Sequence, residues 1–171
     1  MLLTIAGIIS AIAIMNAVLP AVSRSTNAVT TASNTVDERI KTDISVIYAV
    51  GELTATSSPS WVDTNSNSKF DFFVWVKNVG DRTVDLISET DVFFGQPGDI
   101  ARIPYSDDAG GSYPQWDFTV ENATDWTEST TIKVTVTFDD GCPGSCLKPA
   151  GNYFVRVITA NGVATEKFFS I

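Results

Sequence analysis

The sequence predicts an α+β protein in which a long hydrophobic N-terminal α-helix is followed by an all-β immunoglobulin-like sandwich. Two observations carry this prediction. Residues 1–23 contain no charged side chain, and apolar residues then recur at helical spacing to about residue 47. Beyond residue 48 the helical period gives way to short β-type runs separated by turn residues. We therefore expect a helical arm, residues 1–49, which forms a filament core or a membrane segment, and a β-sandwich outer domain, residues 50–171.

The composition argues against several functional classes. The chain has 171 residues and no His, which removes the commonest general base and the commonest metal ligand, so we expect no enzyme. The formal net charge of −9, with only 11 Lys and Arg, argues against a nucleic-acid partner, because phosphate binding needs clustered basic residues. Basic and acidic residues balance in residues 1–50, so the whole negative charge lies on residues 51–171.

The first twenty residues are apolar on every side of the expected helix. At a rise of 1.5 Å per residue, about 20 residues cross a hydrocarbon core of about 30 Å, so the length permits a membrane anchor. A secretory signal peptide would need basic residues before the apolar run, and their absence indicates that a charged leader has been removed or that translation starts upstream. The other way to cover such a helix is with copies of itself. The residues expected to pack there are Leu2, Leu3, Ile5, Ile8, Ile9, Ile12, Met15 and Leu19.

The helix is expected to continue as an amphipathic one. Val29, Ala32, Val36, Ile40, Ile44 and Ile47 recur at steps of three and four, and polar residues fill most of the other positions. This spacing predicts one helix from about residue 2 to about residue 47. Pro20 is expected to kink that helix or to remove one of its backbone hydrogen bonds.

Five runs rich in aromatic and β-branched residues are expected to form strands. They span residues 70–79, 83–94, 130–138, 153–159 and 163–171. Strict alternation in residues 131–138 places Ile132, Val134, Val136 and Phe138 on one face. The dipeptide Asn161-Gly162 between the last two runs is typical of a tight hairpin.

Residues 63–71 carry side-chain oxygens at alternate positions, as the first half of a calcium loop does. The loop departs from the EF-hand pattern, because Ser68 stands where that pattern has Gly and Val74 where it has a bidentate Glu. The alternative is a polar Asx-turn connection before a strand. No cofactor is required, and Ca²⁺ is the one ion for which the sequence offers candidate ligands. They are Asp63, Asn65, Asn67 and Asp71.

Three further features belong to the expected domain surface and core. Cys142 and Cys146 flank a Pro-Gly turn, where a disulfide or two free thiols could occur, and two Cys without His are too few ligands for zinc. Asn122 begins the triplet Asn-Ala-Thr, which is an N-glycosylation pattern that also arises by chance. The aromatic residues could bind sugar, but they more often fill a sandwich core; adjacent pairs such as Phe72 and Phe73 put one ring on each face of a strand.

Three segments behind the long helix carry a family resemblance. They read WVKNVG at residues 75–80, DVFFG at residues 91–95 and GNYFVRV at residues 151–157. In this order the chain resembles the archaellins, the filament subunits of the archaeal-type flagellum, over nearly its whole length. Like archaellins, it lacks the acidic fifth residue of bacterial type IV pilins, having Ile5. Turn chemistry alone would also explain the first segment, as a strand ending in a turn, because Asn78 and Gly80 tolerate positive φ.

The resemblance implies a structural role without catalysis. Archaellins are made as precursors with a short leader and enter the membrane before assembly. They then polymerise through the N-terminal helix into an extracellular cell-surface filament for swimming and adhesion. The implied partners are other copies of the chain, the archaellum motor and assembly-platform proteins, and the membrane before assembly.

Two other interpretations stay open at this point. The chain also resembles the accessory, stator-like pilin-family proteins of the same machine, which stay anchored in the membrane. From another class, it could be a secreted sugar-binding β-sandwich module behind an uncleaved anchor.

Overall fold

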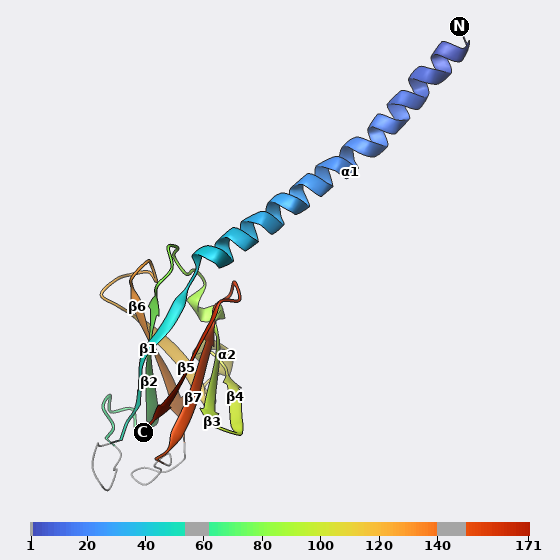
Figure 1. The fold of residues 1–171 in the computed structure, drawn as a ribbon. Helices are drawn as coiled ribbons and strands as arrows, with labels where there is room; N and C mark the ends of the chain where they lie inside the picture. Colours follow the sequence, from blue (N-terminus) through green and yellow to red (C-terminus); the bar gives the residue numbers. More distant parts are fainter. Residues whose placement is uncertain (1, 54–61, 140–149) are drawn as a thin grey trace. The chain divides into compact units, whose positions relative to one another are not determined.

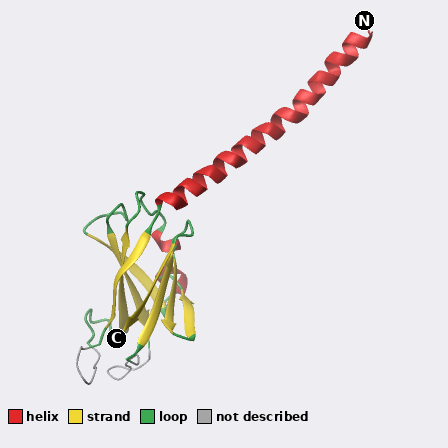
Figure 2. Cartoon of the chain, viewed as in Figure 1, coloured by secondary structure: helices red, strands yellow, loops and turns green. Residues whose placement is uncertain are grey.

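The computed structural model in Figure 1 describes residues 2–53, 62–139 and 150–171. The chain forms two compact units, Met1–Glu38 and Arg39–Ile171. A helix, α1 (Leu2–Lys41), accounts for the first unit, and strands dominate the second, as Figure 2 shows. The fold class predicted from the sequence, a long N-terminal helix followed by an all-β sandwich, is confirmed.

Within the described residues, the sandwich consists of two four-stranded antiparallel sheets. The first has the order β1-β2-β6-β5, with the bounds β1 (Ile44–Gly51), β2 (Phe70–Asn78), β6 (Thr131–Phe138) and β5 (Gln115–Glu121). The second has the order β4-β3-β7-β8, with the bounds β4 (Asp99–Ile103), β3 (Asp91–Gln96), β7 (Asn152–Ile158) and β8 (Ala164–Ser170). Two short helices, η1 (Ile87–Glu89) and α2 (Ser106–Ala109), lie in the connections.

The edges of the two sheets meet where β1 lies beside β8. The Val46 N–H donates to Oγ1 of Thr165 at 3.3 Å, and Nζ of Lys167 donates to the carbonyl oxygen of Ile47 at 2.9 Å. Side-chain hydrogen bonds therefore replace a backbone ladder between these two edge strands, which covers edges that would otherwise pair with other chains.

The core follows from the alternation of side chains along each strand. In β6, Ile132, Val134 and Val136 are fully buried and Phe138 packs partly against them, as the sequence predicted. The Phe72 ring lies at the centre of an aromatic cluster, with ring centroids between 4.5 and 6.3 Å away. Its neighbours are Phe70, Phe94, Phe138, Tyr153 and Phe169.

The predicted C-terminal end of the helix is wrong. The helix ends at Lys41, and Ile44 begins β1. Ile44 and Val46 are buried while Ile47 is exposed, and the register between β1 and β2 shifts between Val46 and Tyr48. The apolar residues near position 44 fit a helical and a strand pattern equally, and pairing with β2 buries two β-branched side chains that a continued helix would leave in solvent.

The predicted strand over residues 83–94 is too long, because only its last part belongs to β3. Residues before η1 include Leu86, whose φ of 54° lies in the left-handed region that interrupts a strand. β4 and β5 are missing from the predicted set. Most β4 side chains are exposed, and β5 mixes exposed, intermediate and buried positions, so neither strand carries a clear apolar alternation.

Replacing Phe72 should test the dependence of the sandwich on its aromatic cluster. We expect Phe72→Ala to lower the free energy of unfolding by about 3–5 kcal/mol, because it leaves a cavity between the two sheets. The matched control is Phe168→Ala, which removes the same ring from an outward position that is 64% exposed and should cost about 1 kcal/mol or less. Denaturant unfolding followed by tryptophan fluorescence measures both changes, and equal losses would contradict the assignment.

Candidate functional site

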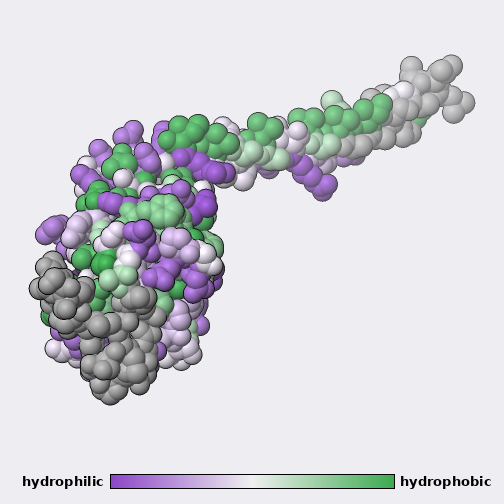
Figure 3. Space-filling view, turned by 60° about the horizontal axis from the view of Figure 1, so that its bottom comes forward, coloured by the Kyte–Doolittle hydropathy of each residue, from purple (hydrophilic) through white to green (hydrophobic). Residues whose placement is uncertain are grey.

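One side of α1 carries an exposed apolar seam. Its residues recur at steps of three, four or seven, which is the spacing that keeps side chains on one face of a helix. Figure 3 shows hydrophobic side chains along one side of the helix in this view and hydrophilic ones on another side. The seam consists of Ile5, Ile12, Met15, Leu19, Val22, Val29, Val36 and Ile40, whose side chains are 54–76% exposed.

The seam becomes narrower beyond Pro20. Before that residue, Ile14 and Val18 are also exposed and widen the apolar surface. After it, every exposed large apolar side chain of the described helix lies on the seam, and Thr26 and Ser33 occupy its remaining heptad positions. A narrow a/d seam fits one neighbouring helix, whereas an apolar surface on several sides needs several neighbours or lipid.

Threonine hydroxyls in the second half of α1 bond to their own helix. Oγ1 of Thr26 donates to the Val22 carbonyl oxygen at 3.0 Å, and Thr30 and Thr35 form the same bond with the residue four positions earlier. Such bonds satisfy the hydroxyl donors without water. The helix can therefore be covered by an apolar partner without leaving these donors unpaired.

The residues predicted to pack in a filament core are only partly described. The side chains of Ile5, Ile12, Met15 and Leu19 are exposed on the seam. Those of Leu2, Leu3, Ile8 and Ile9 lie outside the described side chains. Within the part of the chain whose placement is given, no helix has both the length and the hydropathy that crossing a bilayer requires.

The turn after β2 lies against the chain as it leaves α1. Backbone N–H groups of Val79 and Gly80 both donate to the Asp43 carbonyl oxygen, and that of Asp81 donates to the Lys41 carbonyl oxygen. A Cβ at Gly80 would collide with the Asp43 nitrogen and the Lys41 oxygen. Gly80 is therefore needed for close backbone approach.

Asn78 is a fully buried polar residue that joins three segments. Its Nδ2 donates to the carbonyl oxygens of Arg82 at 2.7 Å and Trp126 at 3.1 Å, and its Oδ1 accepts from the Gly80 N–H at 3.0 Å. Neither Asn78 nor Gly80 is among the described residues with positive φ, so the segment is not explained by a left-handed turn. In the segment WVKNVG, Asn78 thus joins separate segments through buried hydrogen bonds, and Gly80 lets two stretches of backbone approach closely.

The four candidate calcium ligands lie together beside the start of β2. Nδ2 of Asn65 donates to Oδ2 of Asp71 at 2.6 Å, and Nδ2 of Asn67 donates to the same oxygen at 2.9 Å. The Asp63 carboxylate accepts the backbone N–H groups of Asn67 and Ser68. Amide NH₂ groups, rather than carbonyl oxygens, therefore face Asp71, which is the arrangement of the polar Asx-turn alternative. The calcium site stays a prediction.

Glu52 completes this loop and was missed by the sequence reasoning. It is buried, and its carboxylate accepts from the Thr64 N–H at 2.8 Å and the Asp71 N–H at 3.0 Å. Burial raises the pKa of the Asp71 carboxyl and the Glu52 carboxylate adds to this effect, while hydrogen bonds from Thr137, Asn65 and Asn67 oppose it. The described residues contain no group of three or more His, Cys, Asp or Glu placed to hold a metal.

The other predicted sites divide between described and undescribed segments. Cys142 and Cys146 lie outside the described residues, so the disulfide stays a prediction. Asn122 is exposed just after β5 with φ of 59°, and Oγ1 of Thr124 donates to Asp125 at 2.9 Å. The glycosylation site also stays a prediction.

Most described aromatic residues fill the core, as expected. Trp116 and Trp126 are almost completely buried. Adjacent aromatic pairs divide between the faces of their strands, because Phe72 and Phe94 are buried while their neighbours Phe73 and Phe93 are only partly covered.

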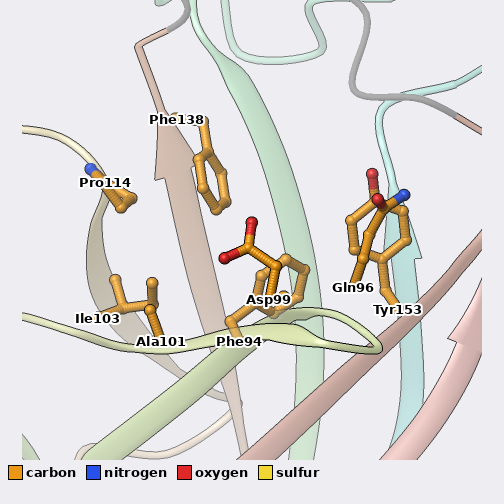
Figure 4. A pocket seen from close by; sticks show the side chains of 9 residues that line it. Phe94, Gln96, Asp99, Ala101, Ile103, Pro114, Phe138 and Tyr153 are labelled. Atoms are coloured by element: carbon orange, nitrogen blue, oxygen red, sulfur yellow. The ribbon is translucent and has the colours of Figure 1, made fainter.

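A cavity of about 290 Å³ opens at one end of the sandwich, beside the β3–β4 hairpin (Figure 4). Its walls include Phe94, Ile103 and Phe138, and its titratable lining residues are Asp99 and Tyr153. Asp99 is exposed at the mouth of this cavity. The cavity is best described as an incompletely filled end of the core.

The chain is similar to a family of archaeal proteins and to solved structures of archaellum proteins. A family model for archaeal-type flagellin matches residues 1–168. An uncharacterized protein of Archaeoglobus fulgidus is 27% identical over 174 residues, covering 99% of this chain and 94% of that protein. Among solved structures, the archaellum periplasmic stator protein FlaG of Sulfolobus acidocaldarius has a TM-score of 0.52 and 21% identity, covering 75% of this chain and 99% of that one. The stator complex of FlaF and FlaG from the same organism has a TM-score of 0.51 and 22% identity, covering 74% and 87%.

Substitution of Gly80 should test the junction between the helix exit and the sandwich. We expect Gly80→Ala to lower the free energy of unfolding by about 1–3 kcal/mol, because the new methyl group collides with backbone atoms that cannot rotate away. Gly151→Ala is the matched control, since the nearest atom to its Cβ would be Nε2 of Gln96 at an ordinary 3.6 Å. Its effect should stay below about 1 kcal/mol in the same denaturant titration.

The raised pKa of Asp71 has a consequence for stability. A carboxyl whose pKa is higher in the folded state contributes stability that is fully present below its unfolded pKa and lost as pH rises through the folded value. We expect this contribution to make the unfolding free energy of the wild type fall as the pH rises above about 4. In Asp71→Asn the decline should disappear.

Unfolding titrations at several pH values between 3 and 8 measure this dependence. Asp99→Asn, which removes an exposed carboxylate, controls for the loss of one negative charge and should retain the wild-type slope. A slope that Asp71→Asn leaves unchanged would contradict the assignment.

Proposed function

The chain belongs to the archaeal-type flagellin family, and on this premise we propose that it is an accessory, stator-like subunit of the archaellum at the cell surface. In this role the N-terminal helix joins the subunit to a helical neighbour or to the membrane. The β-sandwich then binds other archaellum proteins. No catalytic step and no cofactor are part of the proposal.

The observation that carries the accessory role is the likeness of the sandwich to FlaG, described as a periplasmic stator protein. It extends over nearly the whole of the FlaG chain. FlaG also appears in a complex with FlaF, so a fold of this kind can pair with a second archaellum protein. We extend to this chain the expectation that its sandwich binds a partner rather than a substrate.

The shape of the seam on α1 supports the same choice. Beyond Pro20 the exposed large apolar side chains of the described helix form one narrow row, ending with Val36 and Ile40. A row of this width is covered by a single neighbouring helix. A complex of only a few subunits can provide that single neighbouring helix.

A filament subunit is the second candidate. It is favoured by the family model, which includes the N-terminal segment, and by the wider apolar surface that Ile14 and Val18 add before Pro20. Many copies packed around one axis would cover that surface. An extracellular position would also suit glycosylation at Asn122 and a disulfide between Cys142 and Cys146, which we keep as proposals.

Location and copy number separate the two roles. We would tag the chromosomal copy at its C-terminus, shear the surface appendages from the cells, and quantify the tagged chain in the filament and envelope fractions by mass spectrometry. We expect it in the envelope fraction at a small fraction of the copy number of the major filament protein. If it is the dominant protein of the sheared filaments, the accessory role is wrong.

A pair of helix variants tests the seam in the same cells. We expect Val29→Lys to abolish co-purification with the envelope partner, because a charge on the seam would have to be buried in an apolar interface. Thr31→Lys places the same charge on an exposed position of α1 outside the seam and should leave co-purification intact. Equal losses in both variants would mean that the seam is not the contact surface.

A further inference from the structure

We infer that the outer face of the first sheet, over β1, β2 and β6, binds an acidic polysaccharide. Three aromatic rings lie on this face: Tyr48, which is 56% exposed, and the half-buried Phe73 and Trp75. We call them the aromatic row. The inference goes beyond the proposed function, which gives the sandwich a protein partner and names no surface for it, because it assigns a saccharide ligand to one face of the sandwich.

The rings of the aromatic row follow one another across two strands. Tyr48 lies opposite Trp75 in the register of β1 and β2, with ring centroids 5.5 Å apart and planes at 45°. Phe73 lies two positions before Trp75 along β2, with centroids 6.2 Å apart and planes at 54°. Each of these centroid distances is comparable with the size of one sugar ring. Because the ring planes are tilted relative to one another, successive sugar units of a twisted polysaccharide can each stack on one aromatic ring. The C–H faces of pyranose rings stack on aromatic faces of this kind.

The core does not require these rings. The same strand already buries Phe72, Val74 and Val76 on its inner face. Apolar side chains gathered in one exposed place are a feature of interaction surfaces. Since α1 has its own apolar seam, the aromatic row is a second surface with a different chemistry.

The surroundings of the aromatic row favour a sugar over an apolar protein surface. The next strand, β6, presents Lys133 opposite Trp75 and Thr135 opposite Phe73. Both are hydrogen-bonding side chains, so the rings are bordered by polar groups at the distance of one strand. A rim of hydroxyl and ammonium groups beside stacked rings matches the alternating C–H faces and hydroxyl edges of a saccharide.

The charge of this face identifies the class of saccharide. The chain carries a net charge of −9, yet two lysines border the aromatic row: Lys77 lies two positions after Trp75 on β2, and Lys133 lies opposite Trp75 on β6. Nζ of Lys133 lies 5.6 Å from the Phe73 ring centroid. Within the described residues neither lysine forms an ion pair, so both are available to the carboxylates of a uronate.

Acidic side chains limit the site to three strands. Asp117 and Glu121 lie on β5, beyond β6, where they would repel an anionic chain. Asp71 precedes the aromatic row on the same side of β2 but is buried beside Glu52. The cationic and aromatic part of the face is therefore confined to β1, β2 and β6.

Binding to a defined acidic polymer tests the inference. The full-length chain in detergent would be titrated with polygalacturonate in affinity electrophoresis and calorimetry, with dextran as the neutral polymer. We expect binding to polygalacturonate that weakens with added salt, and none to dextran. Trp75→Ala should weaken binding about tenfold or more, and Lys133→Gln should reduce both the affinity and its salt dependence.

One control variant and one further site variant complete the test. Phe168→Ala removes an exposed ring from the second sheet and should leave binding unchanged. Tyr48→Ala removes the most exposed ring of the aromatic row, so it should weaken binding without disturbing the core. No binding to polygalacturonate, equal binding to dextran, or binding that survives both Trp75→Ala and Lys133→Gln would overturn the inference. Each of these results is independent of where the tagged chain is found in cells.

Discussion

The apolar seam on α1 is exposed, and the need to cover it is the constraint from which the other features of the chain follow. Side chains such as Met15, Leu19 and Val29 are each more than half exposed, and transferring apolar surface from water is worth about 25 cal/mol per Å². The helix is too long for a small sandwich to bury, and its threonine hydroxyls already bond to their own backbone. The chain is therefore built to acquire a partner along this helix.

The hydrophobic core of the sandwich is complete without the helix. Its aromatic cluster around Phe72 fills the space between the sheets, and its edge strands β1 and β8 cover each other through side-chain hydrogen bonds. Asn78 and Gly80 then fix the backbone at the point where the helix ends.

Periodicity explains which parts of this structure could be predicted. β6 alternates strictly and α1 repeats apolar residues over many turns, so both were identified from spacing alone. The helix end could not be placed from the sequence, because Ile44 and Ile47 continue the helical spacing. The pairing of β1 with β2 is what places both residues in a strand. Glu52 escaped prediction for a similar reason: nothing in its local sequence shows that β2 brings Asp71 beside it. The role of Asn78 likewise depends on carbonyl groups from distant segments, including that of Trp126.

Adjacent phenylalanines show how one strand can serve two purposes. Phe72 completes the core, whereas Phe73 belongs to the aromatic row on the opposite face. The seam on α1 is aliphatic and bordered by small polar side chains, whereas the aromatic row is bordered by Lys77 and Lys133. An aliphatic helix would leave those lysines desolvated and unpaired, and a charged saccharide would gain nothing from the seam. The two surfaces therefore call for partners of different chemistry, and a subunit that holds one neighbour through its helix and another through its sandwich is suited to link two structures.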